Sequence, residues 1–274
     1  MMDQSRLVFV KLGGSLITDK TRPITPRLDV IQHLANEISA AVKSSPGLSL
    51  LIGHGSGSFG HEVADRYQTQ AGGEGQAYWQ GFSEVWQAAR ALNQIMIEAL
   101  TDAGLPVIAF PPSAGIITQN RCIISWDVQP IKLALYHGLI PVIYGDVVFD
   151  IECGGTILST EALFMELTRS ICPQQILIAG LDLGVFADPN QPTQVIPLIT
   201  PQTIQEFRPV LSGSQAVDVT GGMLAKVEAM VTLVEENPSL QVHIFSGRSS
   251  GNLQKALSDA EARFGTRITH QANS

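Results

Sequence analysis

The chain has 274 residues, of which 45% are hydrophobic and 15% charged. That length and composition exclude a disordered chain, a coiled-coil array and a peptide too short for its own core. Its 17 lysines and arginines against 25 aspartates and glutamates give a formal net charge of −8, which disfavours nucleic acid and anionic membranes as partners. A phosphate-binding site would have to concentrate positive charge locally, from only six lysines.

Cysteine usage and hydropathy predict a cytoplasmic protein without a membrane segment. The three cysteines have neither the even number of a disulfide framework nor the paired spacing of a zinc site, so we expect ordinary thiols. The apolar run 7–10 is too short for the core of a signal peptide, and prolines interrupt the uncharged stretch 103–120.

Short apolar runs bounded by glycine, proline or polar turns are typical of strands buried on both faces. There are six such runs, at 7–12, 48–53, 106–110, 140–144, 176–179 and 242–245. Residues 29–43 and 222–236 carry apolar side chains on one helical stripe and are predicted helices. The alternation of strands and helices favours a mainly parallel α/β sheet with ligands at the carboxyl ends of its strands.

Two regions depart from this alternation. Residues 145–158 predict a hairpin, with 113–125 pairing nearby, and the Pro-, Gln- and Asn-rich stretch 187–200 predicts a surface loop. A change in composition around 172–180 indicates a boundary between two lobes that share one continuous sheet.

The first segment with chemical character ends the first predicted strand, at residues 9–15. Lys11 is followed by Gly13, Gly14 and Ser15, and glycine lets backbone amides turn toward an anion without a Cβ in the way. The segment therefore predicts a phosphate contact, with a plain strand-to-loop turn as the alternative. Lys20 follows on the next loop.

The second segment, 53–61, is a glycine-rich loop after the second predicted strand. Gly55, Gly57 and Gly60 fit the dinucleotide fingerprint, but the acidic partner of that fingerprint is only loosely matched, so a nicotinamide enzyme is disfavoured. We interpret the loop as a second anion cradle, where a helix N-terminus and His61 donate hydrogen bonds to a phosphate.

The third segment, 217–226, places Thr220 and two glycines, Gly221 and Gly222, before a predicted helix with Lys226 one turn in. Such a lysine points back toward the start of the helix and adds to its partial positive charge. Three of the six lysines thus lie beside glycine-rich turns, which predicts one polyphosphate site. Residues 180–189 follow a strand and could wrap a nucleotide.

Four further polar residues have less specific positions. His54 borders a buried strand, and we expect it to satisfy a backbone group. Asp146, Asp150 and Glu161 are expected to orient lysines rather than to bind metal tightly, although turn or capping roles are the more common use of such residues.

Together these segments resemble the amino-acid kinase superfamily, and within it the isopentenyl phosphate kinases, over nearly the whole chain. The motifs that carry the resemblance are Lys11-Leu12-Gly13-Gly14-Ser15 with Ile17-Thr18-Asp19-Lys20, His54-Gly55-Ser56-Gly57-Ser58-Phe59-Gly60-His61, Gly145-Asp146-Val147, Gly180-Leu181-Asp182, Asp218-Val219-Thr220-Gly221-Gly222-Met223 with Lys226, and Gly251-Asn252-Leu253. The histidine that closes the second glycine loop distinguishes phosphate acceptors from carboxylate acceptors in this superfamily.

The resemblance implies a three-layer αβα sandwich and a homodimer, with the phosphate acceptor bound by an N-terminal lobe, 1–172, and ATP by a C-terminal lobe, 173–274. It implies catalytic roles for Lys11, Lys20, Lys226 and His61. The acceptor, isopentenyl phosphate, would contact Gly55, Gly60, His61 and Gly155. ATP would contact Lys11, Gly13, Gly14, Ser15, Ser56, Asp182, Gly222 and Lys226.

The implied reaction suits these residues. A phosphate monoester is already an anion near neutral pH, so its phosphorylation needs no general base, only charge neutralisation and alignment by lysines, glycine loops and nucleotide-bound Mg²⁺. Two departures from the family pattern stand out. Thr160-Glu161-Ala162 replaces a usual Gly-Asp-Asp, so Glu161 would do the work of an aspartate with a longer arm, and Ser56 replaces a common glycine.

An apolar wall would select the acceptor. The residues considered for it are Tyr78, Phe82, Val85, Trp86 and Ile97 on one predicted helix, faced by Ile116, Ile117 and Ile143. Core packing explains such a stripe equally well. Two other functions stay open: a kinase of the same fold acting on a phosphonate such as fosfomycin, and a non-catalytic nucleotide-binding regulatory or storage protein.

Overall fold

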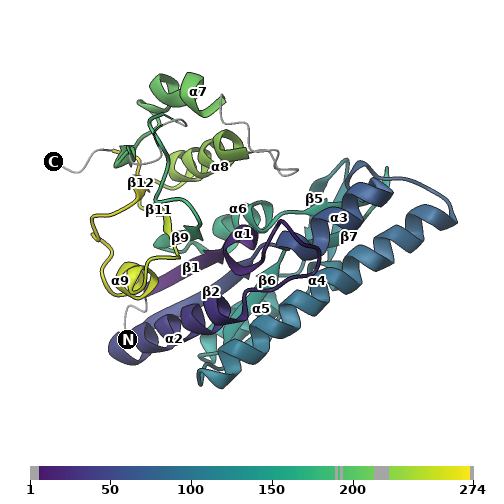
Figure 1. The fold of residues 1–274 in the computed structure, drawn as a ribbon, viewed down its shortest axis with the longest axis horizontal. Coiled ribbons are helices and arrows are strands. Elements are labelled where there is room, and N and C mark those ends of the chain that lie inside the picture. The colour runs from purple at the N-terminus through teal and green to yellow at the C-terminus, as the bar shows by residue number, and fades with distance from the viewer. Residues whose placement is uncertain (1–5, 189–190, 192–193, 213–221, 272–274) are drawn as a thin grey trace.

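The computed structural model describes residues 6–188, 191, 194–212 and 222–271, without the side chains of 61, 62, 210 and 212. Its framework is an eight-stranded sheet with helices on both faces, extended at one end by a smaller four-stranded sheet (Figure 1). This arrangement confirms the predicted αβα sandwich.

The large sheet contains all six predicted strands. Its order is β10 (Leu198–Ile199), β12 (Thr266–Ile268), β11 (Gln241–Ser246), β9 (Gln175–Gly180), β1 (Arg6–Leu12), β2 (Leu48–His54), β6 (Ile140–Tyr144) and β3 (Val107–Ala109). Every neighbouring pair is parallel except β11 with β12. The strands of 1–172 form one half of the sheet and those of 173–274 the other, joined where β1 pairs with β9.

Alternate side chains of the central strands enter two separate cores because successive residues of a strand point to opposite faces. Val8 and Val10 of β1 pack with α2 (Leu28–Ser44), α4 (Gln76–Asp102) and α9 (Asn252–Ser258) on one face. Phe9 packs on the other face with α5 (Gln129–Tyr136), α6 (Thr160–Ile171), α7 (Ile204–Ser212) and α8 (Gly222–Glu236). These strands read as continuous apolar runs because both of their faces are buried.

The small sheet has the order β5 (Cys122–Trp126), β4 (Ile116–Gln119), β7 (Asp146–Asp150) and β8 (Gly154–Leu158). Its β7–β8 pair is the predicted hairpin, and β4 pairs with β7 as expected for 113–125. In the stretch 187–200, the described residues form a loop apart from β10 and an isolated bridge between Phe186 and Val195.

The remaining elements connect these layers. They are α1 (Gly14–Ile17), α3 (Gly57–Tyr67), and the short 3-10 helices η1 (Thr69–Ala71) and η2 (Pro112–Ala114). Among the described residues no helix has both the length and the apolarity to cross a bilayer. All three cysteines are free thiols.

Candidate active site

A cavity of about 490 Å³ opens at the carboxyl ends of β1, β2 and β9, and we call it the main cavity. Lys11 at the end of β1, Lys20 on the loop after α1 and Lys226 in α8 all line it. Lys226 therefore meets Lys11 and Lys20, about 200 residues earlier in the chain, at one cavity, as the sequence predicted. Every residue expected to contact ATP also lines this cavity: Lys11, Gly13, Gly14, Ser15, Ser56, Asp182, Gly222 and Lys226.

The two glycine loops lie backbone against backbone at the floor of the main cavity. A Cβ on Gly14 would be only 2.5 Å from the Gly57 nitrogen, and one on Gly57 would be 2.0 Å from Thr18 Oγ1. Gly57 also has a φ of +50°, a conformation that other residues rarely adopt. The Thr18 hydroxyl ties the loops together, donating to the Gly14 carbonyl at 2.7 Å and accepting from the Ser58 amide at 2.9 Å.

The loop that carries Lys20 is held in place by the start of α3. The amide of Thr25 donates to Ser58 Oγ at 3.1 Å, and the amide of Ile24 donates to the Ser58 carbonyl at 3.2 Å. Next to Lys20, hydrogen bonds from Thr21 and Arg22 lower the pKa of Asp19 to about 2. Lys20 itself is exposed and lines the main cavity.

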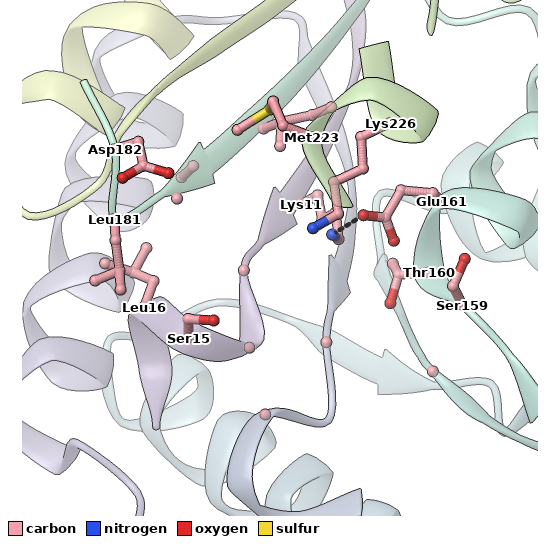
Figure 2. A pocket seen from close by; sticks show the side chains of 18 of the residues that line it. Lys11, Ser15, Leu16, Ser159, Thr160, Glu161, Leu181, Asp182, Met223 and Lys226 are labelled. Atoms are coloured by element: carbon pink, nitrogen blue, oxygen red, sulfur yellow. Dashed lines mark hydrogen bonds and ion pairs between the residues drawn. The ribbon is translucent and has the colours of Figure 1, made fainter. Parts of the chain in front are cut away.

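Glu161 pairs with Lys11 deep in the main cavity (Figure 2). Lys11 is 7% exposed, and the Lys226 side chain descends from α8 toward the same carboxylate. Burial opposes the ionisation of Glu161, but Lys11 and Lys226 outweigh it, so its pKa lies below the ordinary value. Glu161 lies in the first turn of α6, whose N-cap Ser159 accepts a hydrogen bond from the Ala162 amide. Of the three carboxylates that were expected to orient lysines, Glu161 thus contacts one.

Apolar side chains also line the main cavity. Six of them, which we call the apolar wall, are Ile178, Leu181, Phe186, Leu211, Met223 and Ile244. Asp182 lies at its edge, after β9, where burial raises the pKa of its carboxyl group and Lys226 partly offsets that rise. Sequence reasoning had not assigned an apolar wall here, although Met223 lies in the third segment, 217–226, and Leu181 and Phe186 lie in the segment 180–189.

A second cavity of about 440 Å³, which we call the side cavity, adjoins the main one. Ser56, Gly145, Ile157, Leu158 and Ser159 line both. Gly60 lines only the side cavity, whose further wall combines Ala64, Val85, Ala89 and Ala162 with the polar residues Gln70, Arg121, Asp146 and Thr156. Gly55 lines the main cavity. Arg121 was not foreseen, because nothing in its local sequence marks it as part of a site.

The predicted apolar wall is only partly correct, since Val85 alone of its eight residues lines either cavity. Tyr78, Phe82 and Trp86 pack in a cluster with Val85 and Ala64, and a Cβ on Gly155 would be 2.7 Å from Phe82. Gly155 lines neither cavity. The others lie elsewhere: Ile116 and Ile143 in the core beneath α5 and α6, Ile97 against the opposite core, and Ile117 37% exposed.

The second glycine loop carries two histidines, His54 and His61. His54 is 1% exposed, and its ring nitrogens lie 3.2 Å from Asn93 Oδ1 and 3.2 Å from the Gly55 carbonyl, so its predicted structural role is confirmed. His61 lies in α3, and its side chain is outside the described part of the chain. Residues 217–221 of the third segment are likewise outside it.

Asp146 and Asp150 have backbone amides as their partners, so the expectation that they orient lysines is wrong. Asp146 accepts from the amides of Ser113 and Val147, and burial raises its pKa to about 6. Asp150 accepts from four amides in the two adjoining turns, at 120, 121, 152 and 153. Across the described residues, no group of three or more His, Cys, Asp and Glu side chains could hold a metal ion.

Comparison with known proteins agrees with this geometry. Residues 6–246 match the model of the amino acid kinase family. The isopentenyl phosphate kinase of Methanocaldococcus jannaschii is 32% identical over 259 residues, covering 92% of this chain and 95% of that protein. The enzyme of the same name from Methanothermobacter thermautotrophicus is 32% identical over 273 residues, covering 96% and 99%.

A solved structure supports the same relationship. An isopentenyl phosphate kinase structure superposes with a TM-score of 0.79 at 28% identity, covering 96% of this chain and all of that one. The match with the family model spans both halves of the large sheet and all three lysines that line the main cavity. On this evidence the chain belongs to the amino acid kinase family.

Proposed function

We propose that this chain is an ATP-dependent kinase that converts isopentenyl phosphate to isopentenyl diphosphate, a step in isoprenoid biosynthesis. The observation that carries the proposal is the meeting of Lys11, Lys20 and Lys226 on one cavity that continues into a second. Two cavities that share a wall suit two phosphorylated substrates lying end to end. The two relatives at 32% identity, both isopentenyl phosphate kinases, support this choice of acceptor.

In this proposal ATP occupies the main cavity. Its nucleoside lies against the apolar wall and Asp182, and its phosphates lie on the glycine loops. The residues assigned to it are Lys11, Gly13, Gly14, Ser15, Ser56, Asp182, Gly222 and Lys226. Backbone amides beside glycine and ammonium groups both donate to phosphate oxygens, so this set can bind the charge of a triphosphate.

The acceptor phosphate is assigned to Gly55, which lines the main cavity, to Gly60, which lines the side cavity, and to His61. Its five-carbon tail enters the side cavity against Val85, Ala89 and Ile157. Burying that tail would contribute roughly 0.8 kcal/mol per CH₂ group, which favours it over a small bare phosphate. Gly155 acts indirectly, because it lets Phe82 and Tyr78 pack in the cluster that includes Val85.

The catalytic roles follow from where negative charge develops. The loose transition state of phosphoryl transfer spreads charge over the equatorial oxygens of the moving group, so aligned cations lower its energy. Lys11 and Lys226 approach that group from β1 and α8, and Lys20 from its ordered loop. His61 donates to the acceptor phosphate. No residue need act as a general base, since the acceptor oxygen is already anionic.

Glu161 positions Lys11 and Lys226 in this proposal. Without a carboxylate between them, Lys11 and Lys226 would repel each other at the site where both are needed. A glutamate has one more methylene than the aspartate usual in the family. The ion pair with Lys11 supports the view that Glu161 positions this lysine as the aspartate would.

Mg²⁺ is assigned to the phosphates of the nucleotide and to water, the arrangement usual for this ion in kinases. The carboxylates of the main cavity are compatible with this arrangement, because Glu161 is already paired with Lys11 and so is not needed as a direct ligand of the ion. When bound, the ion would neutralise part of the phosphate charge.

Three further properties belong to the same proposal: acceptor binding by residues 1–172 and ATP binding by 173–274, with the lysine and glycine segments of 1–172 contributing contacts to the ATP phosphates; a cytoplasmic location; and a homodimer. The division into lobes is supported by the strand order, which separates these two parts at the β1–β9 pair. The dimer is supported by Ile108 on the edge strand β3 and Tyr136 on α5, which are 39% and 72% exposed. Light scattering would test it.

The proposal is tested by measuring ADP release with isopentenyl phosphate, fosfomycin and a series of alkyl phosphates. We expect kcat/KM to be highest for isopentenyl phosphate. Faster phosphorylation of fosfomycin would replace the proposal with a phosphonate kinase. ATP binding without ADP release on any acceptor would indicate a non-catalytic nucleotide-binding protein.

A further inference from the structure

A buried carboxylate outside both cavities, that of Glu37 in the middle of α2, has no part in the proposed reaction. Glu37 is 6% exposed. Its Oε1 accepts a hydrogen bond from the Gly251 amide at 2.6 Å, and its Oε2 accepts one from the Gln254 amide at 3.0 Å. His33, one turn earlier in α2, places Nε2 2.7 Å from Oε1. Since a buried carboxylate is costly unless it is paired, these contacts fix Glu37 against the start of α9.

The contact crosses between the two halves of the chain. The α2 helix belongs to 1–172, and α9 follows the turn 246–251 at the end of β11. Glu37 holds the last residue of that turn, Gly251, while Asn252 holds the first by donating from Nδ2 to the Ser246 carbonyl at 3.1 Å. The turn is therefore fixed at both ends, and the contact at its last residue comes from the other half.

The turn 246–251 lies directly behind the wall of the main cavity. Ser246 Oγ donates to the Leu181 carbonyl at 2.9 Å, and the Gly247 amide donates to the Gly180 carbonyl at 2.9 Å. A Cβ on Gly247 would be 2.5 Å from Leu16 Cδ2, so the turn also supports that side chain. Leu16, Gly180 and Leu181 all line the main cavity, and so does Asp182, which directly follows Leu181 in the chain.

From this chain of contacts we infer that Glu37 is a positioning residue for the nucleotide. It fixes the turn 246–251, and the turn holds residues 180–182 where the nucleoside binds. The inference rests on the proposed function, since it takes the nucleoside to lie against Asp182. Nucleotide affinity then depends on Glu37, although Glu37 does not touch the nucleotide. Residues 180–182 are already held in the binding geometry, so binding does not lose the free energy that ordering them would cost.

The experiment compares three variants with the wild-type chain. Glu37→Gln removes the negative charge and one of the two oxygens that accept hydrogen bonds from the Gly251 and Gln254 amides. Ser246→Ala removes the hydrogen bond from the turn to the Leu181 carbonyl. The matched control is Ser39→Ala, also in α2, since the 4% exposed Ser39 donates to the Ala103 carbonyl at 2.7 Å, away from α9. Dissociation constants for a non-hydrolysable ATP analogue are measured by calorimetry well below each melting temperature, with KM for ATP and for isopentenyl phosphate alongside.

We expect Glu37→Gln and Ser246→Ala each to weaken binding of the analogue by roughly fivefold or more and to raise KM for ATP similarly. KM for isopentenyl phosphate and the Ser39→Ala affinity should stay within about twofold of wild type. The double variant Glu37→Gln with Ser246→Ala should be less affected than the product of the single effects, because both substitutions break one chain of contacts.

Three results would overturn the inference. In the first, Glu37→Gln lowers the melting temperature but leaves the affinity for the ATP analogue unchanged. In the second, Ser39→Ala weakens binding as much as the other two, which would reduce the effect to general destabilisation. In the third, the two single effects multiply fully in the double variant. A wild-type chain that bound the analogue but did not phosphorylate isopentenyl phosphate would refute the proposed acceptor, while the binding comparison would still decide the role of Glu37.

Discussion

The pair of Glu161 with Lys11 can be tested by removing its negative charge. In Glu161→Gln, the Lys11 ammonium keeps its burial but loses its counter-ion, and the side chains of the pair are only 13% and 9% exposed. Breaking a buried ion pair by removing one partner costs about 3–5 kcal/mol, and because an amide oxygen still faces Lys11 we expect the lower end, about 3 kcal/mol. For a chain of this size that corresponds to a fall in Tm of roughly 6–12 °C.

The same substitution should change the dependence of stability on pH. The pKa of Glu161 is lower in the folded chain than the ordinary value of about 4.3, so its carboxylate stabilises the fold above that pH. This contribution is lost as the pH falls through the folded-state pKa. The difference in unfolding free energy between wild type and Glu161→Gln should therefore be largest near pH 7 and shrink as the solution is acidified.

Urea denaturation at a series of pH values measures both effects. Glu166→Gln is the matched control in the same helix, because Glu166 is 35% exposed and 3.6 Å from Arg169, a surface pair worth at most about 1 kcal/mol. Replacing both partners, as Lys11→Met with Glu161→Leu, should restore much of the stability while abolishing activity. A Glu161→Gln variant as stable as wild type at pH 7, or a difference that grows on acidification, would refute this account of the pair.

Three other predictions concern single residues. Lys20→Ala should lower kcat about 10²–10³-fold and leave the ATP dissociation constant nearly unchanged, as measured by single-turnover kinetics and nucleotide titration. If the affinity for ATP fell as much as kcat, Lys20 would act in ground-state binding instead. His61→Ala should raise KM for isopentenyl phosphate more than tenfold with a smaller change in KM for ATP, and an unchanged acceptor KM would remove His61 from the site. Burial raises the pKa of Asp146 to about 6, so the folded chain holds that proton more tightly than the unfolded one, and stability should fall as the pH rises from about 4 to about 6. Asp146→Asn should flatten that fall in a pH series of denaturation curves, and identical slopes in the two proteins would contradict it.

The central strands were predictable because they are buried on both faces and read as continuous apolar runs. Strands such as β10, with only Leu198 and Ile199, and β12, Thr266–Ile268, carry no such signal and form because a neighbouring strand offers hydrogen-bonding partners. The register of the sheet, and with it the meeting of Lys11 and Lys226, follows from topology rather than from any local pattern.

The site was predictable where its functional residues are close together in the sequence, as in the lysine and glycine segments. It was not predictable where it depends on long-range contact. Glu37 meets amides 214 and 217 residues away, and Arg121 reaches the side cavity from the turn between β4 and β5. The mistaken apolar wall has the same cause, because hydrophobicity marks Ile116 and Ile143 as buried without indicating which face of which element covers them.

The central claim is that the two adjoining cavities hold ATP and a phosphorylated acceptor end to end. A bisubstrate analogue, with adenosine and an isopentenyl group joined through a chain of phosphates, tests this most directly in steady-state inhibition. We predict inhibition that is competitive against both ATP and isopentenyl phosphate, with binding more than about 100-fold tighter than that of either substrate, because one molecule would make both sets of contacts. Competition against only one substrate, with affinity no better than that substrate alone, would contradict the claim.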